Sequence, residues 1–423
     1  MYIISQYIFF IDDWEQRKLE DFGKSTGGTS IESEFDELGK YKVISIGSYS
    51  ETNQYTDQGI RANKTKKTEN RILNKNNLTM ILNDKTASGN IIGRVLLIDS
   101  DNSYIFNQRT ERIEVYENEY LPEFLYQFLN ADNIRGKIIS ASQGNTQIYV
   151  NWTSIRELTY EIPVLKDEQR KITDLFNQLD NLIAFHQRKL NKLKTLKKAY
   201  LSEMFPAEGE RVPKRRFSGF FDDWEQRKFI NVFDYLQNNS LSRSELTNKG
   251  SVINVHYGDV LIKYGEVLNV NKDELTYILD DSIAKKYQVS YLKNGDVIIA
   301  DAAEDNTVGK CSEITGLNEQ IALSGLHTIP CRSKIEFAKG YLGYYMNSDS
   351  FHNQLLPLLQ GTKVSSISKS SIKETEIIYP KNLKEQEVIG EYLSNLNHLI
   401  ALHQRKLEKL KNLKKAYLNE LFV

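Results

Sequence analysis

The sequence predicts an α+β protein in which two compact domains accompany two long helices, and the whole chain is built as an internal two-fold repeat. Three observations lead to this fold class. A long helical stretch is written twice with few changes, an apolar seam follows each copy at heptad spacing, and the remaining segments alternate short β-type runs with Gly, Asn and Asp turns. Two domains that share a frame are therefore expected.

The repeat is nearly literal in the helices. Residues 182–205 and 399–422 align at an offset of 217 and differ at 5 of 24 positions. Shorter motifs extend the repeat, because DDWEQRK occurs at 12–18 and 222–228, and a Gln-Gly pair occurs at 143–144 and 360–361. The enclosed segments, 19–142 and 229–359, show no convincing alignment. The repeated motifs and helices thus stay alike while the segments that they enclose differ. This pattern indicates one scaffold that presents two different surfaces.

The helices are predicted at 168–205 and 385–422. A period of 3.5 residues sustained over about four heptads favours a two-stranded coiled coil, whereas the alternative is that each helix packs separately on its own domain. A His and a Lys interrupt both seams at equivalent places. The predicted seam consists of Leu175, Leu179, Leu182, Leu193, Leu196 and Tyr200 in the first helix and Tyr392, Leu396, Leu399, Leu410, Leu413 and Tyr417 in the second.

The repeat also predicts the domain boundaries. The expected parts are a first domain at 1–142, a conserved region with the first long helix at 143–205, a basic linker at 206–221, a second domain at 222–359 and a second conserved region with its helix at 360–423. Within the domains, β-type runs are expected at 43–46, 91–98, 297–300 and 327–329. Short aromatic helices from Leu121 and Gly340 are expected to serve the core rather than to stack on bases.

Composition is that of an ordinary globular protein, and the net charge of -1 neither demands nor excludes a nucleic-acid partner. The apolar opening segment 1–11 is too short to span a bilayer and indicates an edge segment of a cytoplasmic protein. Charge is uneven, because residues 61–77 contain six Lys or Arg against one Glu in a stretch that reads as loop. We expect this loop to contact phosphate.

Several enzyme classes lack their characteristic residues. The seven prolines are never adjacent, which excludes the (N/D/S)PP(Y/F) loop of amino-methyltransferases, and no glycine fingerprint for a nucleotide cofactor is present. The GKS at 23–25 lacks the first glycine of a phosphate loop. The six histidines show no metal-ligand spacing. Neither catalysis nor a bound metal is expected of this chain.

The order of these motifs resembles the specificity subunits of type I restriction-modification systems. The motifs are DDWEQRK, a variable domain, a Gln-Gly turn, P-x-x-x-x-E-Q and a helix ending in LKKAYL, all given twice and joined by PKRRFSGF. The resemblance covers essentially the whole chain. It implies two target recognition domains, each reading one half of a bipartite DNA sequence, and helices that form an antiparallel coiled coil between them. The family's GDI strand start is matched by GDVLI at 258–262 and GDVIIAD at 295–301, whereas the first domain has NLTMI.

The resemblance also implies partners. In this family the specificity subunit binds double-stranded DNA and docks two modification subunits, and through them the ATP-dependent restriction subunits. S-adenosylmethionine, ATP and Mg are then expected in the partners, with no cofactor in this chain and no membrane partner. The assembled complex would be an adenine DNA methyltransferase and a site-specific deoxyribonuclease, while the specificity subunit catalyses nothing.

Base-contacting residues do not follow from the resemblance, because the family varies there. Reading a base requires Arg or Lys for guanine and Asn or Gln for adenine, on loops that can enter a groove. An ordinary surface role is about equally common for any one such residue. The candidates are Lys64, Lys66, Lys67, Arg71, Lys85, Arg94, Gln108 and Arg109 in the first domain, and Lys263, Tyr264, Asp301, Asp305, Asn306, Lys310, Asn318 and His327 in the second.

Two other functions remain open at this point. The chain could be a scaffold that joins proteins through its coiled coil without reading DNA. It could also be the recognition half of a split single-chain modification enzyme. Gene neighbourhood would separate these, because a type I subunit is expected beside modification and restriction genes.

Overall fold

The computed structural model describes residues 14–85, 88–361 and 363–422, and the chain forms two compact units. The opening segment 1–11 and the first two residues of the first DDWEQRK copy lie outside the described residues. The first unit comprises the chain up to Gln187 together with the stretch from Arg405, and the second runs from Arg188 to Gln404. The described part contains no helix long and apolar enough to cross a membrane.

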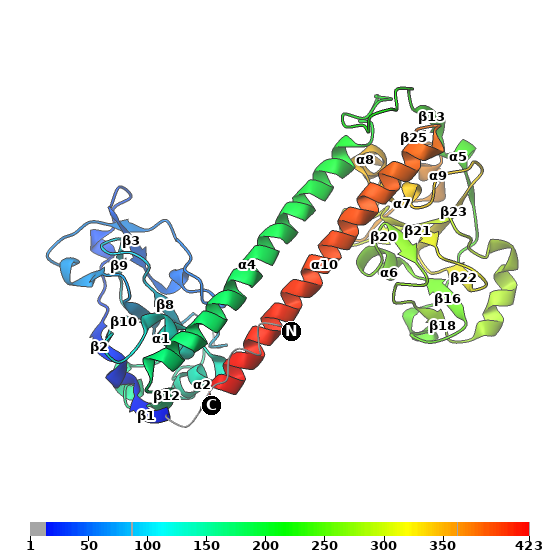
Figure 1. Cartoon of the computed structure of the whole chain (residues 1–423). Helices are drawn as coiled ribbons and strands as arrows, with labels where there is room; N and C mark the ends of the chain where they lie inside the picture. The colour runs from blue at the N-terminus through cyan, green and yellow to red at the C-terminus, as the bar shows by residue number, and fades with distance from the viewer. Residues whose placement is uncertain (1–13, 86–87, 362, 423) are drawn as a thin grey trace. The chain divides into compact units, whose positions relative to one another are not determined.

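Both units are built on the two long helices, α4 (Lys166–Glu203) and α10 (Leu383–Leu421), which Figure 1 shows as coiled ribbons. Each helix begins in one unit and ends in the other. The expected bounds, 168–205 and 385–422, agree with the observed helices to within two residues at each end. Strong periodicity over a long stretch explains this agreement.

The first unit contains two four-stranded sheets. The first sheet is antiparallel, with the order β2 (Gly23–Gly27), β10 (Thr110–Val115), β6 (Leu78–Ile81) and β8 (Val95–Leu97). The second has the order β4 (Arg61–Ala62), β3 (Tyr41–Ile44), β9 (Tyr104–Phe106) and β5 (Ile72–Leu73), with β3 and β9 parallel. Shorter helices are α1 (Pro122–Leu129), α2 (Asp132–Ser140) and α3 (Trp152–Ile155).

The second unit also has two larger sheets, one of five strands and one of four. One sheet has the order β14 (Phe233–Tyr235), β23 (Thr328–Ser333), β19 (Val297–Ala300), β21 (Cys311–Thr315) and β17 (Val267–Asn269). The other has the order β15 (Leu246–Thr247), β18 (Tyr277–Ile278), β16 (Val252–Val255) and β22 (Ile321–Ser324), with β16 and β22 parallel. The helices are α5 (Phe229–Val232), α6 (Tyr257–Ile262), α7 (Tyr341–Met346), α8 (Asp349–Leu355) and α9 (Lys369–Ile372).

Several expected strands are shorter than the sequence suggested, and one is a helix. Of the run 91–98 only β8 is a strand, and the run 43–46 forms only the end of β3. Residues 258–262, which resemble a family strand, lie in α6 instead. The His256 imidazole accepts a hydrogen bond from the Gly258 N–H at 3.2 Å, and this cap starts a helix at that point. The run 297–300 is β19, as predicted.

The two Gln-Gly turns close equivalent small hairpins. The first reaches β11 (Ile148–Tyr149), which pairs with β7 (Asn83–Asp84), and the second reaches β24 (Ser365–Ser366), which pairs with β20 (Ala302–Ala303). Gly144 and Gly361 have φ values of 103° and 109°. A Cβ atom would lie 2.2 Å from a carbonyl oxygen at Gly144 and 2.1 Å at Gly361. Only glycine fits these two positions, which explains why the pair is repeated.

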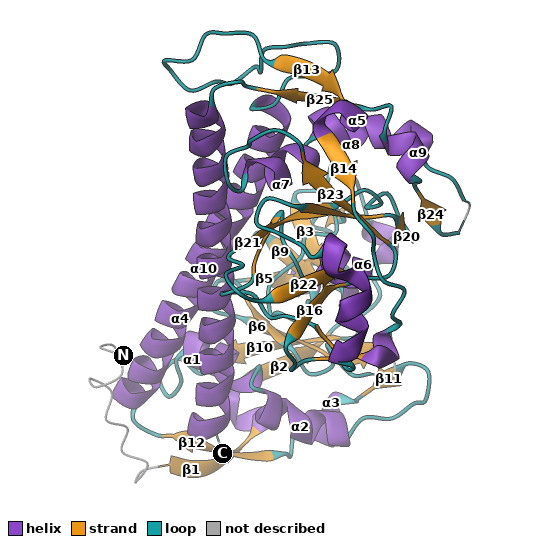
Figure 2. Ribbon diagram, turned by 90° about the vertical axis from the view of Figure 1, so that its right-hand side faces the viewer, coloured by secondary structure: helices purple, strands orange, loops and turns teal. Residues whose placement is uncertain are grey.

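The DDWEQRK copies form edge strands that hold the start of each long helix. β1 (Trp14–Lys18) pairs with β12 (Thr159–Pro163), and β13 (Glu225–Lys228) pairs with β25 (Glu376–Tyr379), as Figure 2 shows. The Trp14 indole donates to the Glu168 carboxylate at 3.0 Å, and the indole of its counterpart, Trp224, donates to that of Glu385 at 3.3 Å. The Glu of each Glu-Gln pair therefore fixes the tryptophan of its own frame.

The Gln of each Glu-Gln pair ties a strand end to a short helix. The Gln169 amide donates to the Pro163 carbonyl at 2.9 Å and accepts from the Leu121 N–H at 2.9 Å. Gln386 makes the same two bonds, to the Pro380 carbonyl at 2.8 Å and from the Ala338 N–H at 2.8 Å. Both amides are buried, so each satisfies backbone groups that water cannot reach.

The long helices run antiparallel within the first unit. Phe176 of α4 lies 5.8 Å from Phe422, which follows α10, and Asp180 of α4 accepts two contacts from the Lys414 ammonium of α10 at 2.7 and 2.8 Å. The residue numbers therefore rise along one helix as they fall along the other. Leu175 and Leu179 belong to a hydrophobic cluster against which further seam residues pack, namely Leu410, Leu413 and Tyr417.

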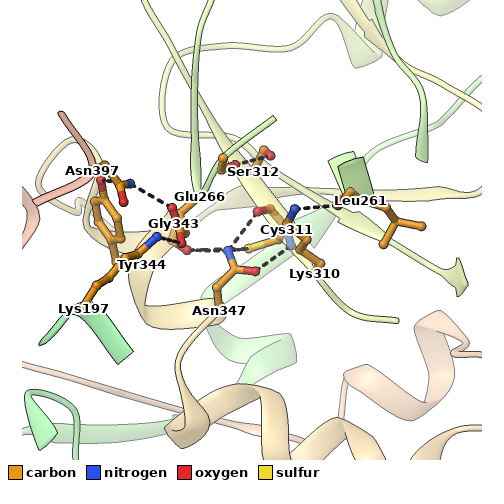
Figure 3. A network of polar contacts seen from close by, with 11 residues as sticks. Lys197, Leu261, Glu266, Lys310, Cys311, Ser312, Gly343, Tyr344, Asn347 and Asn397 are labelled. Atoms are coloured by element: carbon orange, nitrogen blue, oxygen red, sulfur yellow. Dashed lines mark hydrogen bonds and ion pairs between the residues drawn. The ribbon is translucent and has the colours of Figure 1, made fainter. Parts of the chain in front are cut away.

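The same orientation holds within the second unit. The rings of Tyr200 and Tyr392 lie 5.1 Å apart. Leu193 and Leu196 pack against a cluster that includes Leu396. Figure 3 shows a polar network beside this seam, in which the buried Glu266 carboxylate accepts from the Lys197 ammonium of α4 at 2.5 Å and from the Asn397 amide of α10 at 3.0 Å. Each unit thus contains an antiparallel helix pair.

One seam residue was wrongly predicted. Leu399 is 40% exposed, and its equivalent Leu182 is only partly buried. The buried leucines near the middle of the helices are Leu190 and Leu407, which directly follow the lysines that interrupt the seam. A straight helix drifts by about 20° per heptad from a strict 3.5-residue period. The apolar face therefore moves to a neighbouring residue.

The end of each long helix completes the core of the unit that it enters. The Phe422 ring lies 5.1 Å from that of Phe128 and 5.9 Å from that of Phe124, both in α1. The equivalent Phe205, after α4, lies 5.7 Å from Tyr345 in α7 and 6.3 Å from Trp224. The expectation that the aromatic helices serve the core is confirmed, because these rings are buried.

Candidate nucleic-acid interface

A three-residue connection leads into β10 and into β23 at the same place in the two units. It joins β9 to β10 through residues 107–109 and β22 to β23 through residues 325–327. The last residue of each connection, Arg109 or His327, has a left-handed backbone with a φ of 63° or 53°. This conformation costs a non-glycine residue roughly 1–2 kcal/mol, and strain of this kind concentrates at functional sites.

Backbone hydrogen bonds show that these two tips are equivalent. The Leu82 N–H donates to the Arg109 carbonyl at 2.9 Å, and the Asp301 N–H donates to the His327 carbonyl at 3.1 Å. The residues that follow each Gln-Gly turn bond to the same segment. The Val150 N–H donates to the Leu82 carbonyl, and the Ile367 N–H donates to the Asp301 carbonyl. Two strand ends, a tip and a Gln-Gly hairpin therefore converge on one site in each unit.

In the first unit the tip exposes Arg109 and Gln108. The Asn83 amide accepts from the Arg109 guanidinium at 2.9 Å and donates to the Ile148 carbonyl at 3.1 Å. Gln108 donates to the Glu32 carboxylate at 2.9 Å. Hydrogen bonds from Ser30 and Asn107 lower the pKa of Glu32 to about 2. Among the described residues, the Asn83 amide engages one nitrogen of the Arg109 guanidinium, whereas Gln108 is bound to an anion.

In the second unit the tip exposes His327, whose side chain is 52% exposed. Its Nδ1 lies 3.2 Å from the Asp301 carboxylate, and its ring meets that of Tyr257 edge to face at 5.3 Å. Burial raises the pKa of Asp301, against the opposing effect of His327. The structure therefore brings two predicted residues, Asp301 and His327, into one site.

The predicted lysine cluster lies in the loop between β4 and β5. Lys64, Lys66 and Lys67 are exposed. The Lys67 ammonium donates to the Ser33 hydroxyl at 2.9 Å. The neighbouring Ile31 N–H donates to the Asn107 amide at 3.1 Å, which attaches this segment to the tip connection. The lysine loop is thus linked to the Arg109 tip through residues 31–33.

Two predicted arginines of the first domain serve the structure. Arg94 is only 8% exposed and donates to the Asn90 carbonyl at 2.7 Å, which gives it a structural role. Arg71 is half-buried, donates to the Gly27 carbonyl and lies over the Phe106 ring at 5.3 Å. Burial lowers the pKa of both guanidinium groups. Lys85 is exposed directly after β7.

In the second domain Tyr264 and Lys310 are also structural. Tyr264 is 3% exposed and belongs to a hydrophobic cluster. The Lys310 ammonium donates to the Leu261 carbonyl at 2.7 Å, and burial lowers its pKa. Lys263 is exposed and pairs with Glu274 at 3.6 Å. Long polar side chains near apolar runs are hard to place from sequence alone.

The remaining predicted residues lie on two different sides of the second domain. Asp305 and Asn306 are exposed in the connection between β20 and β21, near the His327 tip. Asp305 accepts from the Thr307 N–H at 2.9 Å, as a turn residue does. Asn318 follows β21, whose register with β19 places it at the opposite end of the sheet from Asp301. The tip and Asn318 therefore belong to different surfaces.

Residues beside the first tip were missed by the sequence analysis. Asn83, Glu111, Gln147 and Tyr149 line the same space as Arg109. The Gln-Gly turn was the signal that could have placed two of them, since Gln147 and Tyr149 follow it directly. Within the described ranges, no group of three or more His, Cys, Asp or Glu side chains is placed to hold a metal ion.

Known proteins share both the sequence pattern and the fold. The model of the type I restriction modification DNA specificity domain family matches residues 11–195 and again 221–412. The specificity subunit of the type I restriction enzyme MjaVIII of Methanocaldococcus jannaschii is 23% identical over 423 residues, with 97% of this chain and 92% of the relative covered. The putative MjaX specificity subunit of that organism is 25% identical over 220 residues, 50% of this chain and 48% of the relative.

Solved structures show the same fold over the whole chain. The type I restriction-modification S subunit of M. genitalium has a TM-score of 0.58 at 14% identity and covers 97% of this chain and 96% of its own. A chain from a study of complex assembly and conformational transition in a type I R-M system has a TM-score of 0.55 at 15% identity, with 97% of both chains covered. With two matches to one family model across most of its length, this chain belongs to the type I restriction modification DNA specificity family and is a specificity subunit with two target recognition domains.

Proposed function

We propose that the domain of the first unit reads one half of a bipartite DNA target, that the domain of the second unit reads the other half, and that the paired helices fix the spacing of the half-sites. The observation that carries this is the equivalence of the two tips. The same backbone position, held by the same hydrogen bonds, carries Arg109 in one domain and His327 in the other. Arginine and histidine present different donor patterns to a base edge, so the half-sites are expected to differ.

The partners of the proposed complex follow from the same assignment. Two modification subunits would bind S-adenosylmethionine and methylate adenine, and restriction subunits joined through them would use ATP and Mg to cleave DNA. The specificity subunit is non-catalytic and would act in the cytoplasm by choosing the site. The repeated edge strands, β1 with β12 and β13 with β25, offer two matching frames on which two copies of one partner could dock.

Exchange of one domain tests whether the two readers are separable. Replacing residues 229–357 with the matching part of another specificity subunit should change one half-site of the methylated sequence and leave the other intact, because each domain has its own sheets and core. Methylation-sensitive sequencing of a host with the modification subunits gives both half-sites at once. The unmodified chain is the control. A change in both half-sites would contradict independent reading.

Neutralising the lysine loop tests its proposed contact with phosphate. Substituting Lys64, Lys66 and Lys67 by Gln should weaken binding to all sequences alike, since phosphate contacts carry affinity without sequence information. If all three touch phosphate, the slope of log K against log salt should shrink by about 2–3, at roughly 0.9 per contact.

A single lysine elsewhere on the same domain is a suitable control for the salt slope. Lys75 belongs to the basic segment 61–77 in the sequence, but it is exposed just before β6, whose other end adjoins the Arg109 tip, so the strand separates it from that tip. Lys75→Gln should therefore leave the slope unchanged. An unchanged slope in the triple variant, or loss of discrimination at one base with affinity intact, would show that the lysine loop has another role.

A further inference from the structure

A cavity of about 530 Å³ lies under the tip of the first domain, between the ends of β2 and β6, the start of β10 and the Gln-Gly hairpin. This volume falls in the range of small-ligand pockets, roughly 300–1,000 Å³. Its walls combine two aromatic rings with amides, a cation and a carboxyl group. They include Asn83, Arg109, Glu111, Gln147, Tyr149 and Trp152.

The carboxyl group of Glu111 is unusual because it is buried and unpaired. Glu111 is 4% exposed, and its side chain forms no hydrogen bond or ion pair to any described residue. Burial raises its pKa to about 7, against the opposing effect of the Arg71 guanidinium, which forms no ion pair with it. A buried polar group without a partner is unfavourable. A ligand that brings N–H donors into the cavity would supply the missing partner.

The second domain shows that the fold itself does not need this carboxyl group. The register of β10 with β6 and of β23 with β19 places Ile329 at the position equivalent to Glu111. Ile329 is buried in the apolar core, and Ala302 and Ala303 take the places of Asn83 and Asp84. The side chains at this place are apolar in one domain and polar in the other. Among the described residues, the buried carboxyl group is therefore a specific feature of the first domain.

A base that remains stacked in a double helix presents only one edge to a groove, whereas a base turned out of the helix can enter a cavity and present its Watson–Crick edge to the residues that line it. We propose that this cavity receives one extrahelical base of the DNA that the first domain binds, with the Glu111 carboxylate accepting hydrogen bonds from the N–H groups of the base. The inference rests on the proposed DNA-reading function. Trp152 and Tyr149 offer aromatic surface to the base, and Arg109, which lines the cavity and is exposed, can meet the adjoining phosphate.

Guanine matches the carboxylate best among the four bases. A carboxylate has two acceptor oxygens and no donor when ionised. The Watson–Crick edge of guanine presents two adjacent N–H donors, whereas those of adenine and cytosine present an amino group beside an acceptor. Selection by this pair of bonds would add a sequence requirement that no groove contact supplies.

Fluorescent base analogues test the proposal in the complex of the full chain with its modification subunits. Once methylation mapping has given the target, three fluorescent bases are placed in turn in the first half-site. 6-Methylisoxanthopterin, which keeps both N–H donors of guanine, replaces each guanine, 2-aminopurine replaces each adenine, and pyrrolocytosine replaces each pyrimidine. Emission should rise several-fold on binding at one position other than the methylated adenine. Glu111→Ile, which copies the second domain, should abolish that rise and relax the requirement for that base about ten-fold or more.

Two further variants make the outcome decisive. Glu114→Ala alters the same strand on its other face and should behave as the unmodified chain. Glu111→Gln keeps the shape of the side chain and replaces one acceptor by a donor, so it should reduce the rise even if Glu111→Ile does not fold. If the unmodified chain reads its target but no position other than the methylated adenine responds, the cavity does not hold a base. If Glu111→Ile instead weakens assembly with the modification subunits, the cavity holds a basic side chain of the partner and the proposal is wrong.

Failure of the proposed function would look different from failure of this inference. If the unmodified chain directs no sequence-specific methylation, the proposed DNA-reading function itself is wrong. If the unmodified chain directs methylation normally and the target is unchanged by Glu111→Ile and Glu111→Gln, only the proposal of an extrahelical base is wrong.

Discussion

Replacing Phe422 by alanine should destabilise the first unit by about 3–5 kcal/mol, although the whole second unit separates Phe422 in sequence from the domain that it supports. The ring is fully buried and meets those of Phe124, Phe128 and Phe176 at 5.1 to 5.9 Å. Its removal leaves a cavity that three other rings line. The core of the first domain should therefore loosen around α1.

Hydrogen exchange resolved by segment is the appropriate measurement, because a chain of two units need not unfold in one step. In Phe422→Ala the amides of α1 should lose protection while those of α7 keep theirs. Phe221→Ala is a matched control, because that ring is 85% exposed. Equal protection of α1 in both variants would show that the end of α10 does not complete the first domain.

Removing the Glu266 carboxylate should cost the second unit about 3–5 kcal/mol, because Lys197 would be left largely buried without its partner. The side chains of Glu266 and Lys197 are only 14% and 20% exposed, and Asn397 shares the same carboxylate. Thermal unfolding of Glu266→Ala measures the loss. The double variant Glu266→Ala with Lys197→Met should recover part of it, since no buried charge then remains unpaired.

The pH dependence supplies a second check on this network. Burial raises the pKa of Glu266, but Lys197 and the hydrogen bonds outweigh burial and lower it overall. A carboxyl group with a lowered pKa stabilises the folded state above its unfolded pKa of about 4.3, and this stabilisation is lost as the pH falls below that value. The difference between the unmodified chain and Glu266→Ala should therefore be constant near neutral pH and shrink in acid. A difference independent of pH would exclude the ion pair as its cause.

The repeated motifs could be predicted from the sequence because each of them meets a strict local requirement of backbone geometry or hydrogen bonding. Gly144 and Gly361 occupy positions where a Cβ atom would collide with backbone, and Trp14 and Trp224 each need an acceptor for a buried or partly buried indole. Such requirements keep both copies alike. The period of the long helices is equally strict, apart from the drift that exposes Leu399.

The interior of the two domains could not be predicted as well. GDVLI and GDVII are nearly the same five letters, yet the first lies in α6 and the second runs into β19, because the His256 cap is present only before the first. Many of the strands have two to four residues, too few for a periodic pattern to appear. The shared topology of the domains therefore became visible only through their hydrogen bonds.

The candidate site shows the same limit. Arg94 and Tyr264 have the chemistry of DNA contacts but are buried, and nothing in their sequence neighbourhood distinguishes them from Arg109. The left-handed backbone of Arg109 and His327 is invisible in the sequence, because neither residue is glycine. Glu111 could have been noticed as a charged residue on the inward face of a strand, but the cavity beside it depends on the Gln-Gly hairpin.

The exchange of helix ends between the units has a consequence for synthesis on the ribosome. Phe205 and Phe422 are 217 residues apart, and the core of the first domain needs the later one. At about 5–20 residues per second, the nascent first domain waits roughly 10–40 s for that ring. During this interval the place beside α1 that Phe422 fills is open. The face of α4 that packs against α10 has no partner either. The first unit therefore completes its folding only after the second has been synthesised. Chaperones that shield apolar surface are expected to bind the chain before its translation is complete.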